Sequence, residues 1–211
     1  ILKTNQMLGG WTALISKLFF HKPLLTRCGY EIFDAYRFQM ANGLRKRSKS
    51  VIFIVWLMSF LTYRFSDAVH VATLEDSKIV SKYFKVPPSR IEVRPNWLDL
   101  DVFKNKSYVR KKNRILFVGR LNSQKNIFLL LKALSGTNIS IDIVGEGVLE
   151  KDLRIYAKNK DVNANFLGSF ENNKMPEIYN SYLVYVLCSP YEGNPKTLLE
   201  AMACGCAVIG T

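Results

Sequence analysis

The 211-residue sequence lacks the motifs of several common classes of α/β protein. It contains no G-x-G-x-x-G, which argues against a simple dinucleotide-dependent dehydrogenase, and no G-x-x-x-x-G-K-[ST], which argues against a P-loop NTPase. Its four cysteines, Cys28, Cys188, Cys204 and Cys206, form no C-x-x-C pair, and Cys204 and Cys206 lack partners for a zinc site. We therefore expect small buried thiols in a reduced, cytoplasmic protein.

The sequence also lacks a membrane-spanning run, a recognisable signal peptide and a charged tail. The apolar stretch 51–62 is well short of the roughly 20 residues that cross a bilayer. Because the chain starts at Ile1 and stops at Thr211 directly after a strand-like segment, we expect a piece of a longer protein, truncated at both ends. The net charge of +13 is spread over both halves, so nucleic acid is not the expected partner. A diphosphate ligand or an anionic membrane surface would suit this charge.

Apolar strand-like runs alternate with helical patterns along the chain. From residue 114 on, we predict strands at 115–118, 139–144, 165–168, 183–187 and 207–209, and helices at 127–134, 149–158, 176–181 and 195–203. In the first half we predict helices at 7–20 and 74–84 and strands at 23–27, 67–73 and 91–95. The pattern is typical of an α/β fold, and from residue 114 on the alternation predicts a parallel sheet covered on both faces. Ligands of such sheets bind at the carboxyl ends of the strands.

The segment 44–62 combines a basic start with the apolar run 51–62. We favour a helix buried between layers, because core helices of this length are common. The alternative is an interfacial helix with a basic collar of Arg45, Lys46, Arg47 and Lys49 that contacts the membrane peripherally.

Residues 183–205 predict a strand, a tight acidic turn and a helix. We expect Asn194 to be the N-cap, Pro195 to be the first helical residue and Gly205 to end the helix. The N–H groups at such a helix start attract anions. Glu192 in the turn and Glu200 on the helix suit the hydroxyl groups of a sugar, since a carboxylate accepts two hydrogen bonds from a diol. The plain alternative is a pair of surface glutamates.

Further polar and glycine residues follow the other predicted strands. Gly119 and Gly145 end two of them and would let a ligand approach the backbone closely. Arg120 and Lys125 lie in the segment GRLNSQKN, where their cationic groups suit a diphosphate, although a solvated loop would also contain such a pair.

Three segments resemble one protein family. The string YEGNPKTLLEAMACG with its E-x7-E spacing, the GR-L-x-x-x-K-N segment and the N-x-x-D…F turn from Asn96 to Phe103 are similar to those of group 1 (family 4) retaining glycosyltransferases of the GT-B fold. The resemblance implies two Rossmann-like domains with parallel sheets, both incomplete in this chain. We place the acceptor-side domain at 1–103, a linker at 104–113 and the nucleotide-sugar-binding domain at 114–211.

The resemblance also implies transfer of a sugar from a nucleotide diphosphate sugar to a glycan or lipid-linked acceptor, without metal or cofactor, in the cytoplasm or at the inner face of the membrane. Such a role belongs to polysaccharide and cell-envelope biosynthesis. Arg120, Lys125 and Glu192 are the implied catalytic residues. The implied donor-binding set is Gly119, Arg120, Lys125, Gly145, Phe170, Glu192, Asn194, Lys196, Thr197, Leu198 and Glu200.

The sequence departs from the family pattern at two places. The first strand exit reads Arg27-Cys28-Gly29-Tyr30-Glu31 where the family commonly has a histidine, so the acceptor-side catalytic residue stays unassigned. Asn194-Pro195 replaces a common Phe-Gly, so phosphate contacts should begin with the N–H groups of Lys196 and Thr197. Two other functions remain open, namely a non-catalytic nucleotide-sugar-binding module and a nucleotide-sugar epimerase of the same architecture.

Overall fold

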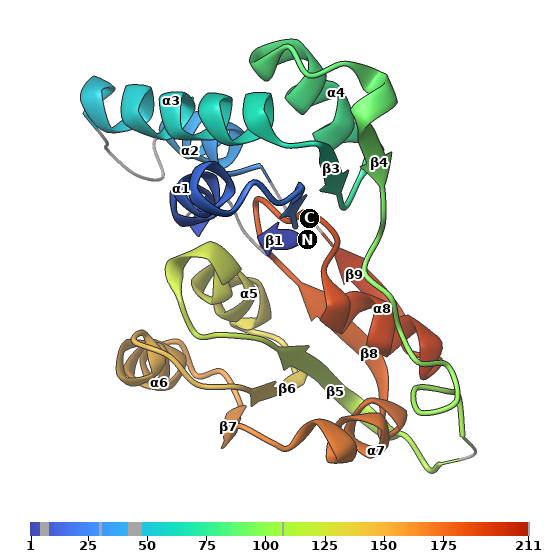
Figure 1. The fold of residues 1–211 in the computed structure, drawn as a ribbon. Coiled ribbons are helices and arrows are strands. Elements are labelled where there is room, and N and C mark those ends of the chain that lie inside the picture. The colour runs from blue at the N-terminus through green and yellow to red at the C-terminus, as the bar shows by residue number, and fades with distance from the viewer. Residues whose placement is uncertain (5–8, 30, 42–47, 107, 211) are drawn as a thin grey trace. The chain divides into compact units, whose positions relative to one another are not determined.

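The computed structural model describes residues 1–4, 9–29, 31–41, 48–106 and 108–210. They form two compact units (Figure 1): Ile1–Asn96 with Tyr191–Asn194, and Trp97–Pro190 with Pro195–Thr211. The first boundary, at Asn96, comes before the predicted linker 104–113, and the first strand of the second unit begins inside that linker. Each unit has one parallel sheet with helices packed on it, so the predicted α/β class is confirmed.

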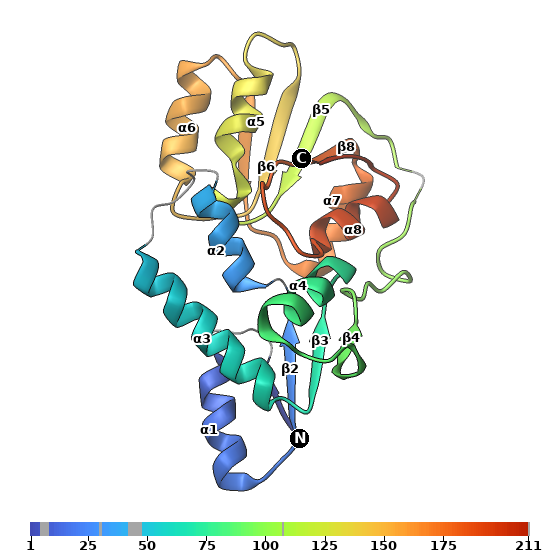
Figure 2. The ribbon, with the colours of Figure 1, turned by 90° about the horizontal axis from the view of Figure 1, so that it is seen from above.

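The first unit has a four-stranded sheet in the order β1-β2-β3-β4 (Figure 2). Its strands are β1 (Leu2–Thr4), β2 (Leu24–Cys28), β3 (Ala68–Val71) and β4 (Ile91–Val93); its helices are α1 (Gly10–Phe20), α2 (Ile32–Ala41), α3 (Lys49–Phe65) and α4 (Leu74–Phe84), with a 3-10 turn at Pro88–Arg90. Because the strands lie side by side in chain order, right-handed crossovers bring the connecting helices to the same face of the sheet.

Two elements of this unit were not predicted. β1 is only three residues long, and α2 has a mixed apolar and polar sequence. The predicted helix 7–20 begins at Gly10 in the structure, and residues 5–8 lie outside the described part. By contrast α4 has the predicted bounds, because Thr73 caps it by accepting a hydrogen bond from the N–H of Asp76 at 3.0 Å.

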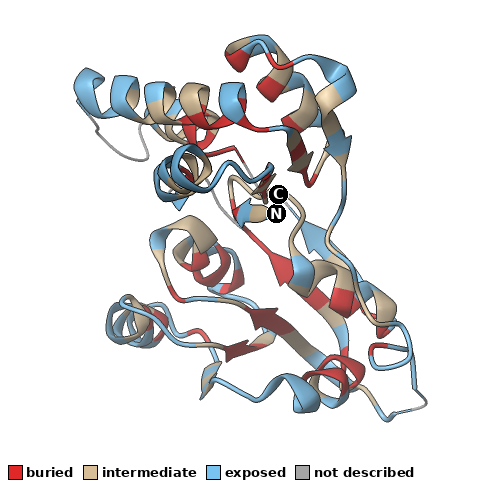
Figure 3. Cartoon of the chain, in the orientation of Figure 1, coloured by how far each residue is buried: buried red, intermediate tan, exposed pale blue. Residues whose placement is uncertain are grey.

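The favoured interpretation of 51–62 as a helix buried between layers is wrong. Figure 3 shows α3 exposed or intermediate over most of its length, with buried residues only towards its C-terminal end. Its small polar residues Ser59 and Thr62 are buried, whereas Phe53 and Ile54 are 59% and 56% exposed. An apolar run does not fix which face packs on the sheet, and here the packed face includes polar groups. Arg45, Lys46 and Arg47 lie outside the described residues. Among the described residues, no helix combines the length and apolar content needed to cross a membrane.

The second unit has a five-stranded sheet in the order β7-β6-β5-β8-β9. Its elements are β5 (Lys111–Val118), a 3-10 turn (Ser123–Lys125), α5 (Ile127–Leu134), β6 (Ser140–Val144), α6 (Glu150–Asn159), β7 (Ala164–Gly168), a 3-10 turn (Asn172–Lys174), α7 (Met175–Asn180), β8 (Tyr182–Leu187), α8 (Lys196–Ala203) and β9 (Ala207–Gly210). The chain adds strands on one side of β5 and then returns to its other side. The sheet therefore has a topological switch point between β5 and β8, where α/β sheets bind their ligands.

Separate apolar cores cover the two faces of this sheet. Leu131 of α5 and Leu153 of α6 pack on one face, and Tyr179 of α7 and Ala201 of α8 pack on the other (Figure 1). Such two-sided burial explains why the strands read as near-continuous apolar runs, which made them predictable within one or two residues at most ends.

One buried charge joins four strands of the sheet. Asp142 on β6 is ion-paired with Arg114 and Lys111 of β5 and accepts hydrogen bonds from Asn165 of β7 and Tyr182 of β8. Burial works against ionisation of Asp142, but these partners outweigh it and lower the pKa of the carboxyl.

Candidate functional site

The carboxyl end of β5 lies against the carboxyl end of β6 through glycine backbone. Gly145 has φ +125°, and a Cβ atom built on it would lie 2.1 Å from the carbonyl oxygen of Gly119. The N–H of Gly119 donates to the carbonyl of Val144 at 3.0 Å, and the N–H of Gly145 donates to the carbonyl of Gly168 at 2.8 Å. Only glycine adopts this φ without strain and leaves room for the Gly119 carbonyl at position 145. This edge of the sheet therefore presents bare backbone to a ligand.

The two predicted cations flank the loop that follows β5. Arg120 is exposed directly after Gly119, and Lys125 ends the 3-10 turn, where the Asn122 side chain accepts a hydrogen bond from the Lys125 N–H. A Cβ atom on Gly119 would lie 3.5 Å from Cε of Lys125, so the lysine side chain runs beside the bare backbone of the strand end. The loop thus places the Lys125 side chain beside Gly119, which Arg120 directly follows in the chain.

Helix α8 starts one residue later than predicted. Pro195, not Asn194, is its N-cap, and the Pro195 carbonyl accepts from the N–H groups of Leu198 at 3.2 Å and Leu199 at 3.4 Å. The prediction of Asn194 as the N-cap is therefore wrong. The first N–H groups of the helix, on Lys196 and Thr197, have no acceptor within the helix and suit an anion.

Glu200 lies on the inner side of α8. It is 6% exposed, and the hydroxyl of Tyr179 donates to its Oε2 atom at 2.9 Å. Burial raises the pKa of the Glu200 carboxyl, against the opposing hydrogen bond from Tyr179 and the charge of Lys196. The tyrosine fixes one oxygen of the carboxylate and leaves the group further capacity to accept a hydrogen bond.

Sequence reasoning missed two tyrosines of this unit. Tyr179 holds Glu200, and the hydroxyl of Tyr185 lies 2.8 Å from the Thr197 hydroxyl at the start of α8. Both belong to apolar segments, where a tyrosine is read as a core residue. The polar role of each tyrosine becomes visible only from its hydrogen-bond partner on α8, which is Glu200 for Tyr179 and Thr197 for Tyr185.

Glu192 and Asn194 group with the first unit. In the same turn, the Tyr191 hydroxyl donates to the Glu31 carbonyl at 3.3 Å, and the Asn96 side chain donates to the Asn194 carbonyl. Glu192 is half-buried, and Phe170 lies in the second unit directly after the Ser169 that follows β7.

Glu31 is a buried acid that sequence reasoning left unassigned. It follows the carboxyl end of β2, and its Oε2 atom accepts a hydrogen bond from the Asp34 N–H at 2.8 Å. Its Oε1 atom is buried without a hydrogen-bond partner among the described residues. Burial, assisted by the charges of Asp34 and Asp76, raises the pKa of Glu31 to about 7 against the bonds it accepts.

Comparisons with known proteins place this geometry in a family. The family model described as glycosyl transferases group 1 matches residues 101–211. A GalNAc-α-(1→4)-GalNAc-α-(1→3)-diNAcBac-PP-undecaprenol α-1,4-N-acetyl-D-galactosaminyltransferase of Campylobacter jejuni is 30% identical over 148 residues, covering 67% of this chain and 40% of the relative. A UDP-Gal:α-D-GlcNAc-diphosphoundecaprenol α-1,3-galactosyltransferase of Escherichia coli is 34% identical over 150 residues, covering 62% and 39%. The chain thus spans well under half the length of these curated relatives.

Solved structures share the fold. Anabaena HepE in complex with UDP has a TM-score of 0.75 at 15% identity, over 99% of this chain and 58% of that one. Sucrose-phosphate synthase from Thermosynechococcus elongatus has a TM-score of 0.80 at 19% identity, over 99% and 55%. These neighbours are GT-B glycosyltransferases, so the predicted fold is confirmed. Since the family model also covers more than half of the sequence, the chain belongs to the group 1 glycosyl transferases.

Proposed function

We propose that the full-length protein transfers a sugar from a nucleoside diphosphate sugar to an acceptor, with retention at the anomeric carbon. The observation that carries the proposal is the carboxyl edge of the second unit's sheet. Bare backbone at Gly119 and Gly145, the Lys125 side chain beside it, and Glu200 behind the start of α8 all lie around the switch point between β5 and β8.

The charges at this edge suit a diphosphate leaving group. As the bond to the sugar breaks, negative charge collects on the diphosphate, and Arg120, Lys125 and the N–H groups of Lys196 and Thr197 would stabilise it. Cations and dipoles fixed before the reaction lower the barrier more than solvent does. We propose that this arrangement works without a metal ion or an organic cofactor, so chelation with EDTA should leave turnover unchanged.

The remaining donor contacts follow from hydrogen-bonding chemistry. Glu200, oriented by Tyr179, would accept from the ribose hydroxyls, which no neutral side chain of that size does as strongly. Glu192 is assigned to the donor sugar by its motif spacing, and Phe170 and Leu198 would line the donor. The name of the E. coli relative contains UDP-Gal, which makes UDP the first nucleotide to test.

A lipid-linked acceptor is favoured over a free glycan. The names of the C. jejuni and E. coli relatives describe acceptors on undecaprenyl diphosphate. Such an acceptor stays in a membrane, so we propose peripheral contact through 44–62 at the cytoplasmic face. The exposed apolar side of α3 and the exposed Lys49 support this placement. The resulting product would be a cell-envelope polysaccharide.

The experiment is a transfer assay of the full-length protein with UDP-sugars. Arg120→Ala or Lys125→Ala should slow turnover roughly 30- to 1,000-fold, the effect of removing about 2–4 kcal/mol of preorganised charge stabilisation. Lys132→Ala, an exposed cation on α5 away from the strand ends, is the matched control and should leave the rate unchanged. Full turnover in both site variants would contradict the assignment, and nucleotide binding without turnover in the wild type would indicate a binding module.

A further inference from the structure

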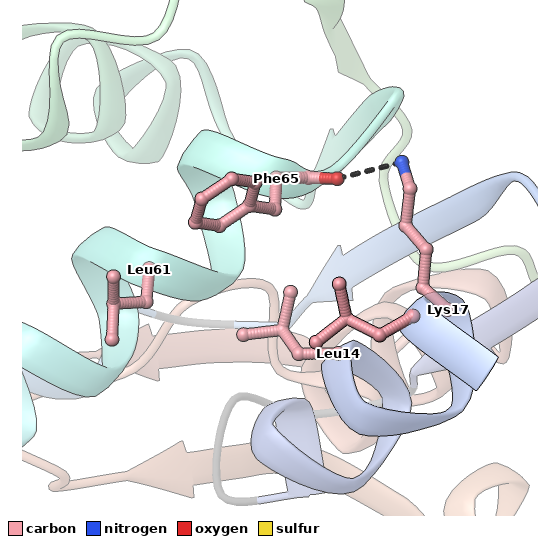
Figure 4. A pocket seen from close by; sticks show the side chains of 5 residues that line it. Leu14, Lys17, Leu61 and Phe65 are labelled. Atoms are coloured by element: carbon pink, nitrogen blue, oxygen red, sulfur yellow. Dashed lines mark hydrogen bonds between the residues drawn. The ribbon is translucent and has the colours of Figure 1, made fainter. Parts of the chain in front are cut away.

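The first unit has a pocket between α1 and α3 (Figure 4). Its lining consists of four hydrocarbon side chains and one lysine, namely Leu14, Leu18, Leu61, Phe65 and Lys17. The Nζ atom of Lys17 donates to the Phe65 carbonyl at 2.8 Å and to Asp67 at 2.6 Å, so its charge is already paired. This pocket does not suit a diphosphate, and the polar groups that do lie in the second unit.

Two buried tyrosines of the second unit pack against α8. Tyr185 belongs to β8 and Tyr179 to α7, and their rings meet edge to face with centroids 6.1 Å apart. The Tyr185 hydroxyl donates to Oγ1 of Thr197 at 2.8 Å, and the Tyr179 hydroxyl donates to Oε2 of Glu200 at 2.9 Å. Because Thr197 and Glu200 are separated by about one helical turn, their side chains lie on the same face of α8. The two tyrosines therefore hold neighbouring polar side chains of one helix face.

The Tyr185 hydroxyl also reaches the end of β5. It lies 3.4 Å from the carbonyl oxygen of Val118, the residue before Gly119. One buried hydroxyl thus contacts both the strand end that leads into the bare backbone of Gly119 and the first turn of α8. The Thr197 hydroxyl is consequently close to the carboxyl edge of the sheet, at the switch point between β5 and β8.

The hydrogen-bond geometry leaves the Thr197 hydroxyl a proton to donate. Tyr185 has one hydroxyl proton, and the 2.8 Å contact with Thr197 is a far better hydrogen bond than the 3.4 Å contact with Val118. With its oxygen accepting from Tyr185, Thr197 can donate its own O–H proton, for which the described part of the chain supplies no acceptor. This proton lies beside the N–H groups of Lys196 and Thr197, which suit an anion.

We propose that Tyr185 is a positioning residue for the donor diphosphate. It turns the Thr197 hydroxyl toward a diphosphate oxygen, so that Thr197 binds the anion through its O–H group as well as its N–H group. The identity of the ligand rests on the proposed function, and the orienting role of Tyr185 is new. Negative charge grows on the diphosphate as the bond to the sugar breaks, so the hydrogen bond from Thr197 strengthens in the transition state.

Isothermal titration of the full-length protein with UDP, GDP and ADP identifies the nucleotide on which variants are compared. Thr197→Val keeps the shape of the side chain without its hydroxyl, and should weaken binding of that nucleotide about tenfold or more. Tyr185→Phe removes only the orienting hydroxyl and should weaken binding about three- to tenfold. Thr197→Ser keeps a hydroxyl and should bind within about threefold of wild type.

Two further readouts separate positioning from a merely structural role. The matching nucleoside, titrated as a competitor of the nucleotide, lacks the diphosphate, so its affinity should be the same in wild type, Thr197→Val and Tyr185→Phe. The double variant Tyr185→Phe/Thr197→Val should bind the nucleotide no more weakly than Thr197→Val alone, because Tyr185 acts through the Thr197 hydroxyl. In a transfer assay, both single variants should lower kcat more than they raise KM.

Tyr182→Phe is the matched control. Tyr182 is another buried tyrosine of β8, and its hydroxyl donates to Asp142 at the opposite end of the strand. This variant should bind the nucleotide like wild type, whatever its melting temperature. Wild-type affinity in Thr197→Val or Tyr185→Phe, an equal loss in Tyr182→Phe, or nucleoside affinity that falls in step with nucleotide affinity would overturn the proposal.

Failure of the proposed function has a different signature. A wild type that binds a nucleotide and transfers no sugar would contradict the proposed function, while the binding comparisons would still decide the role of Tyr185. A wild type that transfers sugar at the same kcat as Tyr185→Phe and Thr197→Val would overturn the role of Tyr185 alone. A wild type that binds none of the three nucleotides would overturn both.

Discussion

The carboxyl group of Glu31 should make the first unit less stable as pH rises from about 4.5 to about 7. The perturbation is Glu31→Gln, which keeps an oxygen to accept from the Asp34 N–H and removes the charge. The wild-type side chain is fully buried, and its pKa is raised from 4.5 to about 7. The neighbouring Asp34 and Asp76 add to the shift through charge repulsion.

The sign and size follow from linkage. Between pH 4.5 and 7 the folded protein keeps the Glu31 proton while the unfolded chain loses it, so stability falls as pH rises across this window and levels off above about 7. At about 1.36 kcal/mol for each pKa unit, the loss reaches roughly 3 kcal/mol as an upper value. Relative to their difference at pH 4, Glu31→Gln should gain about 1 kcal/mol over wild type by pH 5 and up to about 3 kcal/mol by pH 8.

The assay is denaturant unfolding of the full-length protein from pH 4 to 8, with hydrogen exchange of α2 peptides as the local measure. The local measure is needed because the two units need not unfold together. Glu75→Gln on the exposed side of α4 is the control and should show no pH-dependent difference from wild type. Parallel curves for wild type and Glu31→Gln across the whole pH range would refute the reasoning, since the charge of Glu31 would then not be linked to folding.

Two further predictions concern the second unit. Gly145→Ala should lower the free energy of unfolding by about 2–4 kcal/mol and weaken nucleotide binding, because the new Cβ would lie 2.1 Å from the Gly119 carbonyl oxygen. The control Gly210→Ala, whose Cβ would meet no atom within 4 Å, should be near neutral. Equal melting temperatures for the two variants would contradict this prediction. Tyr179→Phe should lower the free energy of unfolding, measured by urea denaturation, by about 1–3 kcal/mol, because it removes the hydroxyl that donates to the buried Glu200. The same variant should raise the nucleotide Kd. An unchanged Kd would show that the tyrosine does not position the Glu200 carboxylate.

The second unit could be predicted from sequence to a large extent, because its strands are buried on both faces. The run from Leu183 to Leu187 and the helix 127–134 are each apolar enough to identify, and the glycines after the strands indicate the binding edge. The N-cap of α8 was predicted one residue too early, at Asn194, because asparagine is a strong capping residue in general, whereas here the Asn194 carbonyl accepts a hydrogen bond from Asn96.

The first unit was harder to predict because its important contacts join distant residues. The apolar run of α3 indicates a helix but not its exposed side, which depends on the packing of Thr62 against α1. Burial of Glu31 likewise depends on elements far along the chain, including Asp76 at the start of α4. A local sequence pattern reveals neither the exposed side of α3 nor the burial of Glu31, so both had to be seen in the structure.

The central claim is that the carboxyl edge of the second unit's sheet binds a nucleoside diphosphate, with Glu200 on the ribose. Isothermal titration of the full-length protein with UDP, GDP and ADP tests it most directly, in wild type, Glu200→Gln and the exposed control Glu177→Gln. We predict that one nucleotide binds, that Glu200→Gln weakens it at least tenfold, and that Glu177→Gln leaves it unchanged. Absence of binding by all three nucleotides, or equal affinity in wild type and Glu200→Gln, would contradict the assignment of this site.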